Sequence, residues 1–572
     1  MIEGYLAADV REAERPYLDA GVPLMERAAF GLAMVALREL RQRRGTTAGA
    51  HAVILAGKGN NGADAMLAGI HLRRRGVAVT ALLVHESGVE STVTALRNAG
   101  ARVLSLSQAL ADCTTGMPWP GIADEVGDSH TPLDWLVGRI HMSDLIVDGI
   151  LGTGTRPGGS SGAGMPDELA ELLMRIGGGW LPRRSVEERR PLVIAVDLPS
   201  GIDPDTGTVV DRNTVLFADV TVTFQCSKAG LLLAPAAEFV GRIEVIDIGI
   251  GEALHGVAPA VARFEPADER LRVYVKAPGW GDHKYTRGVV GVVAGSSQYP
   301  GAGLMATASA VRAGAGMARY LGPANVAELI VSQSPEVVHA PGRVQAYVVG
   351  SGLPSRDEGQ PADIGEQLDR AAAAIEVALG IPTEDGLSLL GLPEGPARKV
   401  PVVVDAGGFS VLPDARVRLT SDVVLTPHAG ELAGLVSSFG PDEVSREQIE
   451  AEPAKYARLA HDLTGATVVL KGPVTVIADE HRLWSQTGPS WLARAGSGDI
   501  LAGIIGSLLA QSDDRQSRAE IAAAGVLVHA TAARIASGQR DDPAAVGRPP
   551  TAQAIIDAVP YAIGRIIAAS SS

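Results

Sequence analysis

The stretch AGKGNNGADAMLAG, residues 56–69, decides the fold of the first half of the chain. It continues the aliphatic run HAVILAG at 51–57, which is typical of a buried strand, and passes at once into a helix-like pattern of small and apolar residues. Gly57, Gly59 and Gly62 stand in the spacing G-x-G-x-x-G at this turn. Glycines there permit a tight turn and a close approach of the backbone to a ligand. The stretch therefore predicts a strand, a tight turn and a helix.

Further aliphatic runs follow in the first half, each bounded by Gly, Pro or charged residues. They are VAVTALLV at 77–84, DLIVDGILG at 144–152 and PLVIAVDLPSG at 191–201, and helix-like patterns such as residues 63–76 lie between them. Strands that alternate with helices form a parallel sheet covered on both faces. We therefore expect residues 1–250 to form one Rossmann-like three-layer α/β domain.

The same alternation restarts in the second half of the chain. Residues 251–274 show little periodicity and are interpreted as a linker. Since one hydrophobic core stops growing beyond about 250–300 residues, residues 275–572 are expected to form a second, independent α/β domain. Its apolar runs are RGVVGVVAG at 287–295, QAYVVGSGL at 345–353, VPVVVDAG at 400–407, DVVLTPHAG at 422–430 and ATVVLKG at 466–472.

Composition excludes several classes of function. With 50 basic and 65 acidic residues, the net charge of −15 has the wrong sign for a protein that neutralises nucleic-acid phosphates. The 2 cysteines lack metal-ligand spacing, so neither a disulfide framework nor a zinc site is indicated. The first residues carry acids where a signal peptide needs bases, and apolar runs such as 501–510 are shorter than the ~20 residues that cross a bilayer. We expect a cytoplasmic homo-oligomer without nucleic-acid or membrane partners.

Polar side chains end several predicted strands of the first half. Asn60, Asn61 and Asp64 supply amide oxygens and a carboxylate at the glycine-rich turn, and these suit a hard cation or a polar ligand better than a bare pyrophosphate does. Asp148 and Asp197 end two later strands. Because ligands bind beyond the carboxyl ends of strands in open parallel sheets, both acids are expected to face one crevice.

Four motifs in order, K-G-N-N-G-x-D, V-D-x-x-L-G-T-G, D-L-P-S-G-I-D and T-F-x-x-x-K-x-G, resemble the NAD(P)HX epimerase family over residues 1–250. That family usually has a second glycine where this chain has Ala63. The resemblance implies inversion at C6 of NADH or NADPH hydrated across the nicotinamide C5–C6 bond, with K⁺ held by Asn61, Asp148 and Ser200. The residues it implies to line the hydrated dinucleotide are Asn60, Asn61, Gly62, Ala63, Asp64, Gly152, Thr153, Gly154, Thr155, Arg156, Pro157, Gly158 and Asp197.

Inversion at C6 requires a bond to that carbon to break and form again. Asp148 and Asp197 are candidate acid and base residues, because positioned carboxyl groups transfer protons. Lys228 is a candidate for stabilising an oxygen or a phosphate, and the alternative is an ordinary exposed lysine. A different class of function is a non-catalytic binding module, as similar domains are in RNA-decapping scaffolds, but the presence of all three residues argues against it.

The stretch ARAGSGDILAGIIGSLLAQ at 493–511 carries the main motif of the second half. Gly496, Ser497, Gly498 and Asp499 immediately precede an apolar helical run, and the N-terminus of a helix attracts anions. Asp499 is positioned to take a proton from an attacking hydroxyl, the alternative being a simple first-turn acid. The motif resembles the anion hole of ribokinase-like phosphotransferases, which implies a ribokinase-like fold.

Three features are more specific than this shared motif: His283-Lys284, LTPHAGE at 425–431 and LKGPVT at 470–475. Together with the later AGSGD, they resemble the ADP-dependent NAD(P)HX dehydratase family over residues 275–572. The resemblance implies that ADP, with Mg²⁺, phosphorylates the C6 hydroxyl, and that elimination regenerates NAD(P)H. It implies dinucleotide contacts at Ala302, Gly352, His428 and Asp499, and nucleotide contacts at Lys471, Gly472, Pro473, Val474, Thr475 and Gly498.

Two features of this half leave alternatives open. His428 in a Pro-His turn has a purely structural alternative, and Gly407 stands where family members often have an acid. The motif G-[ST]-G-D also fits a kinase for a vitamin precursor or sugar alcohol, fused to a non-catalytic Rossmann-like module. The fusion favours repair, because the dehydratase uses one C6 epimer and an epimerase supplies it from the other.

Overall fold

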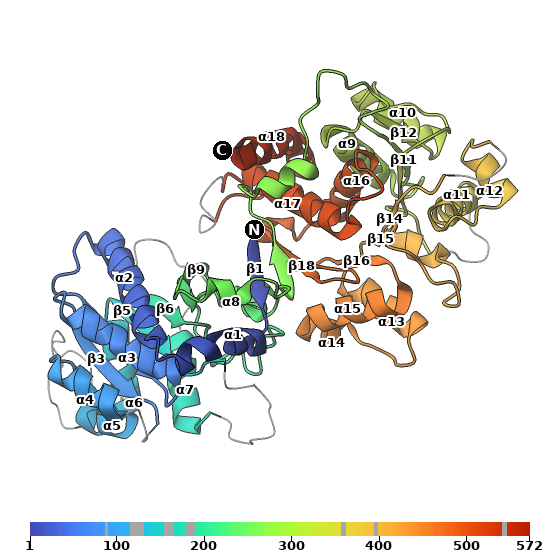
Figure 1. The fold of residues 1–572 in the computed structure, drawn as a ribbon. Helices are drawn as coiled ribbons and strands as arrows, with labels where there is room; N and C mark the ends of the chain where they lie inside the picture. The colour runs from blue at the N-terminus through green and yellow to red at the C-terminus, as the bar shows by residue number, and fades with distance from the viewer. Residues whose placement is uncertain are drawn as a thin grey trace. The chain divides into compact units, whose positions relative to one another are not determined.

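The computed structural model of the chain describes residues 1–85, 90–114, 131–153, 165–178, 190–355, 362–393, 398–539 and 546–571. It divides the chain into two compact units. The first unit is Glu3–Ala260, and the second unit is Met1–Ile2 with Val261–Ser572. Both units combine strands and helices (Figure 1), which confirms the predicted α/β fold class.

The division between the units falls inside residues 251–274, the predicted linker. This stretch has secondary structure of its own, and Val261 and Ala262 are buried because they pair with the strand β18. Its elements are too short to produce a visible hydrophobic period. They are α8 (Gly251–Leu254), β10 (Val261–Arg263) and η3 (Glu269–Val273).

The first unit is built on a 7-stranded sheet with the order β4-β3-β2-β5-β6-β7-β9, in which the neighbours pair in parallel. Counted from β2, this is the order 3-2-1-4-5-6 of doubly wound dinucleotide-binding folds, and the chain reverses direction across the sheet between β2 and β5. Ligands bind at such a point. The strands are β2 (His51–Ala56), β3 (Ala78–Leu83), β4 (Arg102–Ser105), β5 (Leu145–Gly149), β6 (Leu192–Val196), β7 (Val220–Phe224) and β9 (Arg242–Ile246).

Helices cover both faces of this sheet (Figure 1). Ile54 of β2 packs in one core with α2 and α3, and its neighbours Val53 and Leu55 pack in the opposite core with α6 and α7. Side chains alternate in this way because a strand has a period of two. The helices are α1 (Ala7–Asp19), α2 (Leu24–Arg44), α3 (Asn60–Arg73), α4 (Glu90–Asn98), α5 (Leu106–Thr114), α6 (Pro132–His141) and α7 (Asp167–Gly178).

The second unit has the strand order β12-β11-β13-β14-β15-β16-β17-β18-β10. The strands from β12 to β16 pair in parallel as predicted, whereas β16, β17 and β18 form antiparallel pairs joined by short turns. The strands are β11 (Val289–Val293), β12 (Met317–Tyr320), β13 (Ala346–Val349), β14 (Val402–Val404), β15 (Val423–Leu425), β16 (Thr467–Leu470), β17 (Val474–Ala478) and β18 (Leu483–Thr487).

Helices α9, α16, α17 and α18 share one core with alternate residues of this sheet, such as Val290 and Val348, while α11 contacts β13 to β15 outside that core. The sheet is thus covered on both faces (Figure 1). The helices are α9 (Pro300–Arg312), α10 (Ala324–Gln333), α11 (Ala362–Leu379), α12 (Glu384–Leu389), α13 (Ala429–Phe439), α14 (Arg446–Ala451), α15 (Pro453–Thr464), α16 (Ser497–Ala510), α17 (Arg518–Ser537) and α18 (Ala552–Ser571).

By length and composition, α17 and α18 are each long and apolar enough to cross a membrane, and the bent pair α1 and α2 passes the same test together. This differs from the expectation that apolar stretches are too short. In the fold, 78% of the apolar window of α17 is buried, and 39% of that of α18. Helix α17 is apolar on nearly all sides because it packs between α16 and α18 in the core.

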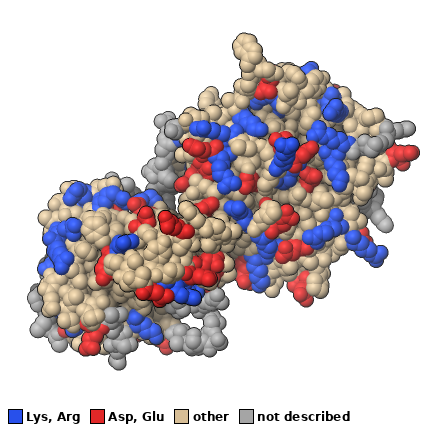
Figure 2. Space-filling model, in the orientation of Figure 1, with Lys and Arg blue, Asp and Glu red and all other residues tan. Residues whose placement is uncertain are grey.

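Charges of both signs are interspersed over the face of each unit that Figure 2 shows. A protein that binds nucleic acid through phosphates instead gathers basic residues along one face.

Candidate active sites

The glycine-rich turn of the first unit lies where β2 and β5 diverge. A Cβ on Gly57 would come within 1.8 Å of Ile150 O, and one on Gly62 within 2.1 Å of Gly57 O. These positions therefore require glycine. Helix α3 begins at Asn60, so the predicted ligand residues Asn60 to Asp64 form its first turns.

The three predicted potassium ligands lie in one buried hydrogen-bond network. Asn61 Nδ2 donates to Val196 O at 2.6 Å and to Leu151 O at 3.2 Å. Leu151 N donates to Ser200 Oγ, which in turn donates to Asp148 Oδ1 at 2.6 Å. Burial raises the pKa of Asp148, while the bonds from Ser200 act in the opposite direction. Strand-end residues from β5 and β6 are thus gathered around the start of α3.

Asp197 and Lys228 form a buried ion pair next to this network. Lys228 Nζ lies 2.5 Å from Asp197 Oδ1, and the two side chains are 3% and 8% exposed. Thr223 Oγ1 donates to the same carboxylate oxygen at 2.9 Å. Lys228 is held here because β8 (Ser227–Lys228) pairs with β1 (Ile2–Tyr5). The alternative of an ordinary exposed lysine is wrong, and the backbone of Asp197 is left-handed, with φ 67°, as is common at functional sites.

A third carboxyl group, Asp64, is buried on α3. Its Oδ1 atom has no hydrogen-bond partner among the residues that the structure describes. Burial raises the pKa of Asp64 well above its ordinary value, and the neighbouring carboxylates Asp197 and Glu14 add to the shift. Burial also raises the pKa of Glu14. The sequence did not indicate Glu14, which belongs to no motif, and it gave Thr223 only as the first residue of the motif T-F-x-x-x-K-x-G, without a role.

The loop from Gly152 to Gly158, which the resemblance implies to line the hydrated dinucleotide, is described only at its start. A Cβ on Gly152 would lie 2.5 Å from Asn61 Oδ1, so this loop lies directly against the glycine-rich turn. Thr153 O accepts a hydrogen bond from Arg11 at 3.1 Å. The predicted residues outside the described part of the chain are Gly154, Thr155, Arg156, Pro157 and Gly158.

In the second unit, the centre of the site is an ion pair between two strand ends. Lys471 Nζ lies 2.6 Å from Asp405 Oδ1, and Glu431 Oε2 lies 3.8 Å from the same nitrogen. Asp405 is 2% exposed and also accepts hydrogen bonds from Ser351 at 3.0 Å and Thr426 at 2.9 Å. The sequence analysis gave Lys471 a role but gave none to Glu431, which ends the motif LTPHAGE, or to Asp405, whose position after a buried strand was a usable signal.

Asp499 lies in the first turn of α16, beside this pair. Burial raises the pKa of Asp499 to about 6, repulsion by Asp405 adds to the shift, and Lys471 opposes it. A Cβ on Gly498 would lie 3.4 Å from Lys471 Nζ, so the glycine keeps the space next to the ammonium group free. The turn is possible because Gly496, which precedes the helix, adopts φ 87°. The arrangement combines an anion site, a cation and a carboxyl group that titrates near neutrality.

His428 performs the structural role that its sequence context suggested. Its Nδ1 accepts a hydrogen bond from Glu431 N, and Glu431 Oε2 accepts one from His428 N, so the two residues cap α13 reciprocally. The ring remains exposed, and the backbone of His428 pairs with that of Lys471. The cap therefore does not prevent a contact between the ring and a ligand.

The other predicted residues of the second unit lie around the same sheet edge. A Cβ on Gly352 would come within 2.4 Å of Ala302 Cβ, so these two residues are in contact. Gly472 and Pro473 form the exposed turn between β16 and β17, and β17 begins with the buried Val474 and Thr475.

Gly407 is required by its own backbone, since a Cβ there would come within 2.0 Å of Leu353 O. An acid at this position would need a different local conformation. Glycine in place of the family's acid at position 407 therefore fits the backbone conformation of this loop.

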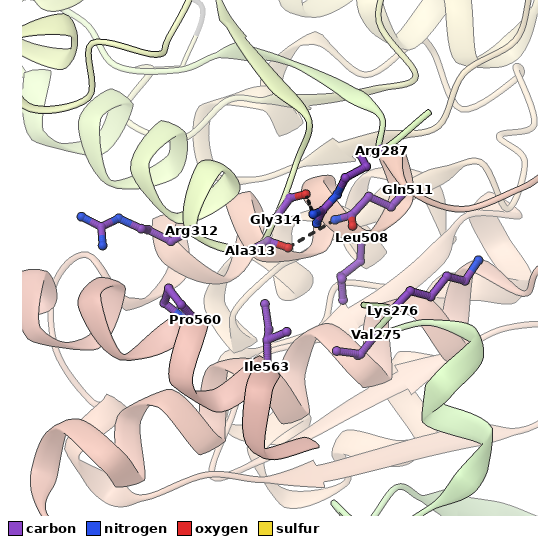
Figure 3. A pocket seen from close by; sticks show the side chains of 10 residues that line it. All are labelled: Val275, Lys276, Arg287, Arg312, Ala313, Gly314, Leu508, Gln511, Pro560 and Ile563. Carbon is purple, nitrogen blue, oxygen red and sulfur yellow. Dashed lines mark hydrogen bonds between the residues drawn. The ribbon is translucent and has the colours of Figure 1, made fainter. Parts of the chain in front are cut away.

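A cavity of about 140 Å³ lies elsewhere in the second unit (Figure 3). Arg287 donates to Gly314 O at 2.7 Å and Gln511 to Ala313 O at 3.2 Å, so these polar groups are already paired. None of the predicted site residues lines it. The lining residues are Val275, Lys276, Arg287, Arg312, Ala313, Gly314, Leu508, Gln511, Pro560 and Ile563.

Two family models match the chain in the order of the units. Residues 22–230 match the model described as YjeF-related protein N-terminus, and residues 290–548 match that of NAD(P)H-hydrate dehydratase. A crystal structure of the ADP/ATP-dependent NAD(P)H-hydrate dehydratase from Bacillus subtilis, co-crystallised with ATP/Mg²⁺, aligns with 54% of this chain and 99% of that chain, at 25% identity and a TM-score of 0.41.

Curated relatives extend the match over nearly the whole chain. The bifunctional NAD(P)H-hydrate repair enzyme Nnr of Mycobacterium leprae is 34% identical over 95% of this chain and 97% of its own length. The NAD(P)H-hydrate epimerase of Clavibacter michiganensis is 39% identical over 45% of this chain and 95% of its own length. The chain therefore belongs to the family of bifunctional NAD(P)H-hydrate repair enzymes.

Proposed function

We propose that the first unit epimerises hydrated NADH and NADPH at C6, and that the second unit dehydrates the S epimer at the expense of ADP or ATP. The observation that carries this proposal is the gathering of Asp499, Lys471 and Asp405 beside the N-terminus of α16. A helix N-terminus binds phosphoryl oxygens, and a carboxyl group of raised pKa is suited to proton transfer. Family membership supplies the substrates.

In the first unit, the start of α3 and the loop at Gly152 would bind the phosphates of the dinucleotide through backbone N–H groups. Asn61, Asp148 and Ser200 would hold K⁺, because carboxylate, hydroxyl and amide oxygens suit a hard cation. The fit is supported by Asp148, whose buried carboxylate has no cationic side chain paired with it in the described part of the chain. A bound cation would supply the missing charge.

In the second unit, Asp499 would take the proton of the C6 hydroxyl as that oxygen attacks the terminal phosphorus of the nucleotide. Lys471 would stabilise the phosphoryl oxygens, and the hairpin from Lys471 to Thr475 would bind the nucleotide with Gly498. The phosphate then leaves C6 with the C–O electrons as a C5 proton is lost, which restores the double bond. His428, Ala302 and Gly352 would contact the hydrated dinucleotide.

Mg²⁺ fits the second unit in the manner usual for nucleotide sites, where one or two carboxylates and the phosphates bind the ion together. Glu431 is the acid that would hold it together with the phosphates, and the ion would neutralise charge during transfer. Among the described residues there is no group of three or more His, Cys, Asp or Glu side chains that could hold a metal alone. Homo-oligomeric state and cytoplasmic location stay predictions.

The test is the growth of NAD(P)H absorbance when the purified chain is added, with ADP, Mg²⁺ and K⁺, to a mixture of the two hydrate epimers. We expect absorbance to rise beyond the share of the S epimer, and Asp499→Ala to abolish the rise. A stable phosphorylated product without NAD(P)H would instead establish a small-molecule kinase.

A further inference from the structure

Three carboxyl groups and one ammonium group interact at the buried end of the first unit's site. Glu14 comes from α1, Asp64 from α3, Asp197 from the end of β6 and Lys228 from β8. The ammonium group of Lys228 pairs with only one of these acids, because Lys228 Nζ lies 2.5 Å from Asp197 Oδ1 and also donates a hydrogen bond to Thr223 Oγ1. Asp64 therefore has no ion-pair partner among the residues that the structure describes.

We propose that Asp64 is a catalytic acid of the epimerase, which protonates the leaving hydroxyl of C6 next to the Asp197–Lys228 ion pair. This role rests on the proposed function of the first unit and adds a proton donor to a residue so far assigned only to binding. The geometry that supports it is the 6% exposure of Asp64 and its Oδ1 atom, which lacks a partner in the described structure. Unpaired buried polar atoms are rare unless a ligand or a function uses them.

The surrounding charges favour the protonated form of Asp64. Burial is the largest cause of its raised pKa, and Asp197, Glu14 and Glu26 add repulsion, while Lys228 alone opposes it. A buried carboxyl group of raised pKa keeps a proton that it can donate, so Asp64 is suited to the role of a general acid.

The chemical step balances without an oxidant or reductant. C6 of the hydrate bears the hydroxyl and is bonded to N1 of the ring. The C6–O bond breaks with its electron pair going to oxygen, the Asp64 proton converts that oxygen into water, and the N1 lone pair forms a double bond to the now planar C6. Water then adds to the other face, the double-bond electrons return to N1, and the released proton returns to the Asp64 carboxylate.

Asp64→Asn in the full chain tests the proposal, because the amide keeps the size and neutrality of the protonated acid but cannot donate in this way. Conversion of purified R hydrate to S hydrate is followed by chromatography without any nucleotide, so the second unit stays inactive. We expect kcat to fall by about 10²–10⁴-fold, the usual effect of losing a general acid, with KM changed little. Glu12→Gln, which removes an exposed acid of α1 that does not act on the pKa of Asp64, is the matched control and is expected to keep kcat.

The pH profile separates catalysis from a structural role. Wild-type kcat is expected to fall as pH rises through the pKa of Asp64, because the acid form is required, and this limb is expected to disappear in Asp64→Asn. If that variant unfolds, Asp64→Glu, which keeps a proton donor, is expected to retain part of kcat and a shifted limb. The proposal would be overturned if Asp64→Asn kept the wild-type kcat and pH profile, or if Asp64→Glu folded but were fully inactive. A wild-type chain that does not epimerise the hydrate would instead overturn the proposed function of the first unit.

Discussion

Lys471 Nζ lies 2.6 Å from Asp405 Oδ1, although the two residues follow β16 and β14, which are separated in the sheet by β15. Their pairing places a positive charge beside Gly498 and a negative charge near Asp499. The ion pair therefore influences both proposed tasks of the second unit, the binding of phosphate and the transfer of a proton.

Dehydration is expected to require the ionised form of Asp499. Since the pKa of this group is raised to about 6, kcat/KM for dehydration should rise as pH increases through about 6 and then level off. Stopped-time assays of NAD(P)H formation from S hydrate give this profile. Asp499→Asn should remove the activity and leave epimerisation of the R hydrate unchanged, and equal loss of both activities would contradict the assignment.

The same shift has the opposite consequence for stability. The folded chain binds a proton at Asp499 more tightly than the unfolded chain, whose pKa is near 3.8. Protonation of Asp499 therefore stabilises the folded chain, and this gain in the free energy of unfolding is complete below pH 3.8 and is lost as pH rises through about 6. Asp499→Asn should therefore be more stable than wild type at pH 7 in urea unfolding, and the difference should shrink on acidification. A wild type that is more stable at neutral pH would show that Asp499 is not desolvated in this way.

Asp405→Asn is expected to shift the acid limb of the dehydration profile to lower pH. The variant removes the repulsion that raises the pKa of Asp499 and leaves Lys471 free to stabilise the ionised carboxylate. Asp479→Asn changes another buried acid of the same unit, which accepts backbone hydrogen bonds from His481 and Arg482, and serves as the control. If the acid limb stayed at the wild-type pH in both variants, Asp405 would not influence the pKa of Asp499.

Lys228→Met is expected to destabilise the first unit and to abolish epimerisation. Breaking a buried pair from one side leaves an uncompensated charge and costs about 3–5 kcal/mol. Adding Asp197→Asn removes that charge, so the double variant should recover much of the free energy of unfolding without recovering activity. Thermal and urea unfolding measure the first effect, and chromatography of the hydrate epimers measures the second. Additive losses in the double variant would indicate that the two side chains do not interact.

ADP is expected to stabilise the chain through the hairpin at Lys471. A ligand at one hundred times its Kd adds about 2.7 kcal/mol to the stability of the form that binds it. Calorimetry of the full chain should therefore show a transition that moves to higher temperature with ADP and Mg²⁺. Lys471→Ala should lose the shift, while Lys455→Ala, on the exposed surface of α15, should keep it. A shift that survives in Lys471→Ala would place the nucleotide elsewhere.

Short-range pattern was sufficient to predict the alternation of strands and helices and the loops at their ends. Asn61, Gly62 and Asp64 lie within one turn of helix, and Gly498 and Asp499 are adjacent, so their proximity follows from the chain itself. The antiparallel strands β17 and β18 were missed because short apolar runs do not indicate direction. The sequence analysis did not predict that α17 is apolar on nearly all sides either, because only the tertiary structure shows that other elements of the core surround this helix.

The sequence by itself determined which residue types end the strands, and therefore that Asn61, Asp148 and Asp197 lie at the ligand-binding edge of a parallel sheet. Only the tertiary structure decided which charges meet. The order of strands brings Lys228 to Asp197 across 31 residues and Lys471 to Asp405 across 66, and no local pattern encodes such distances. Burial then raises the pKa of Asp64, because the free energy of a charge depends on the solvent and partners around it rather than on its neighbours in sequence.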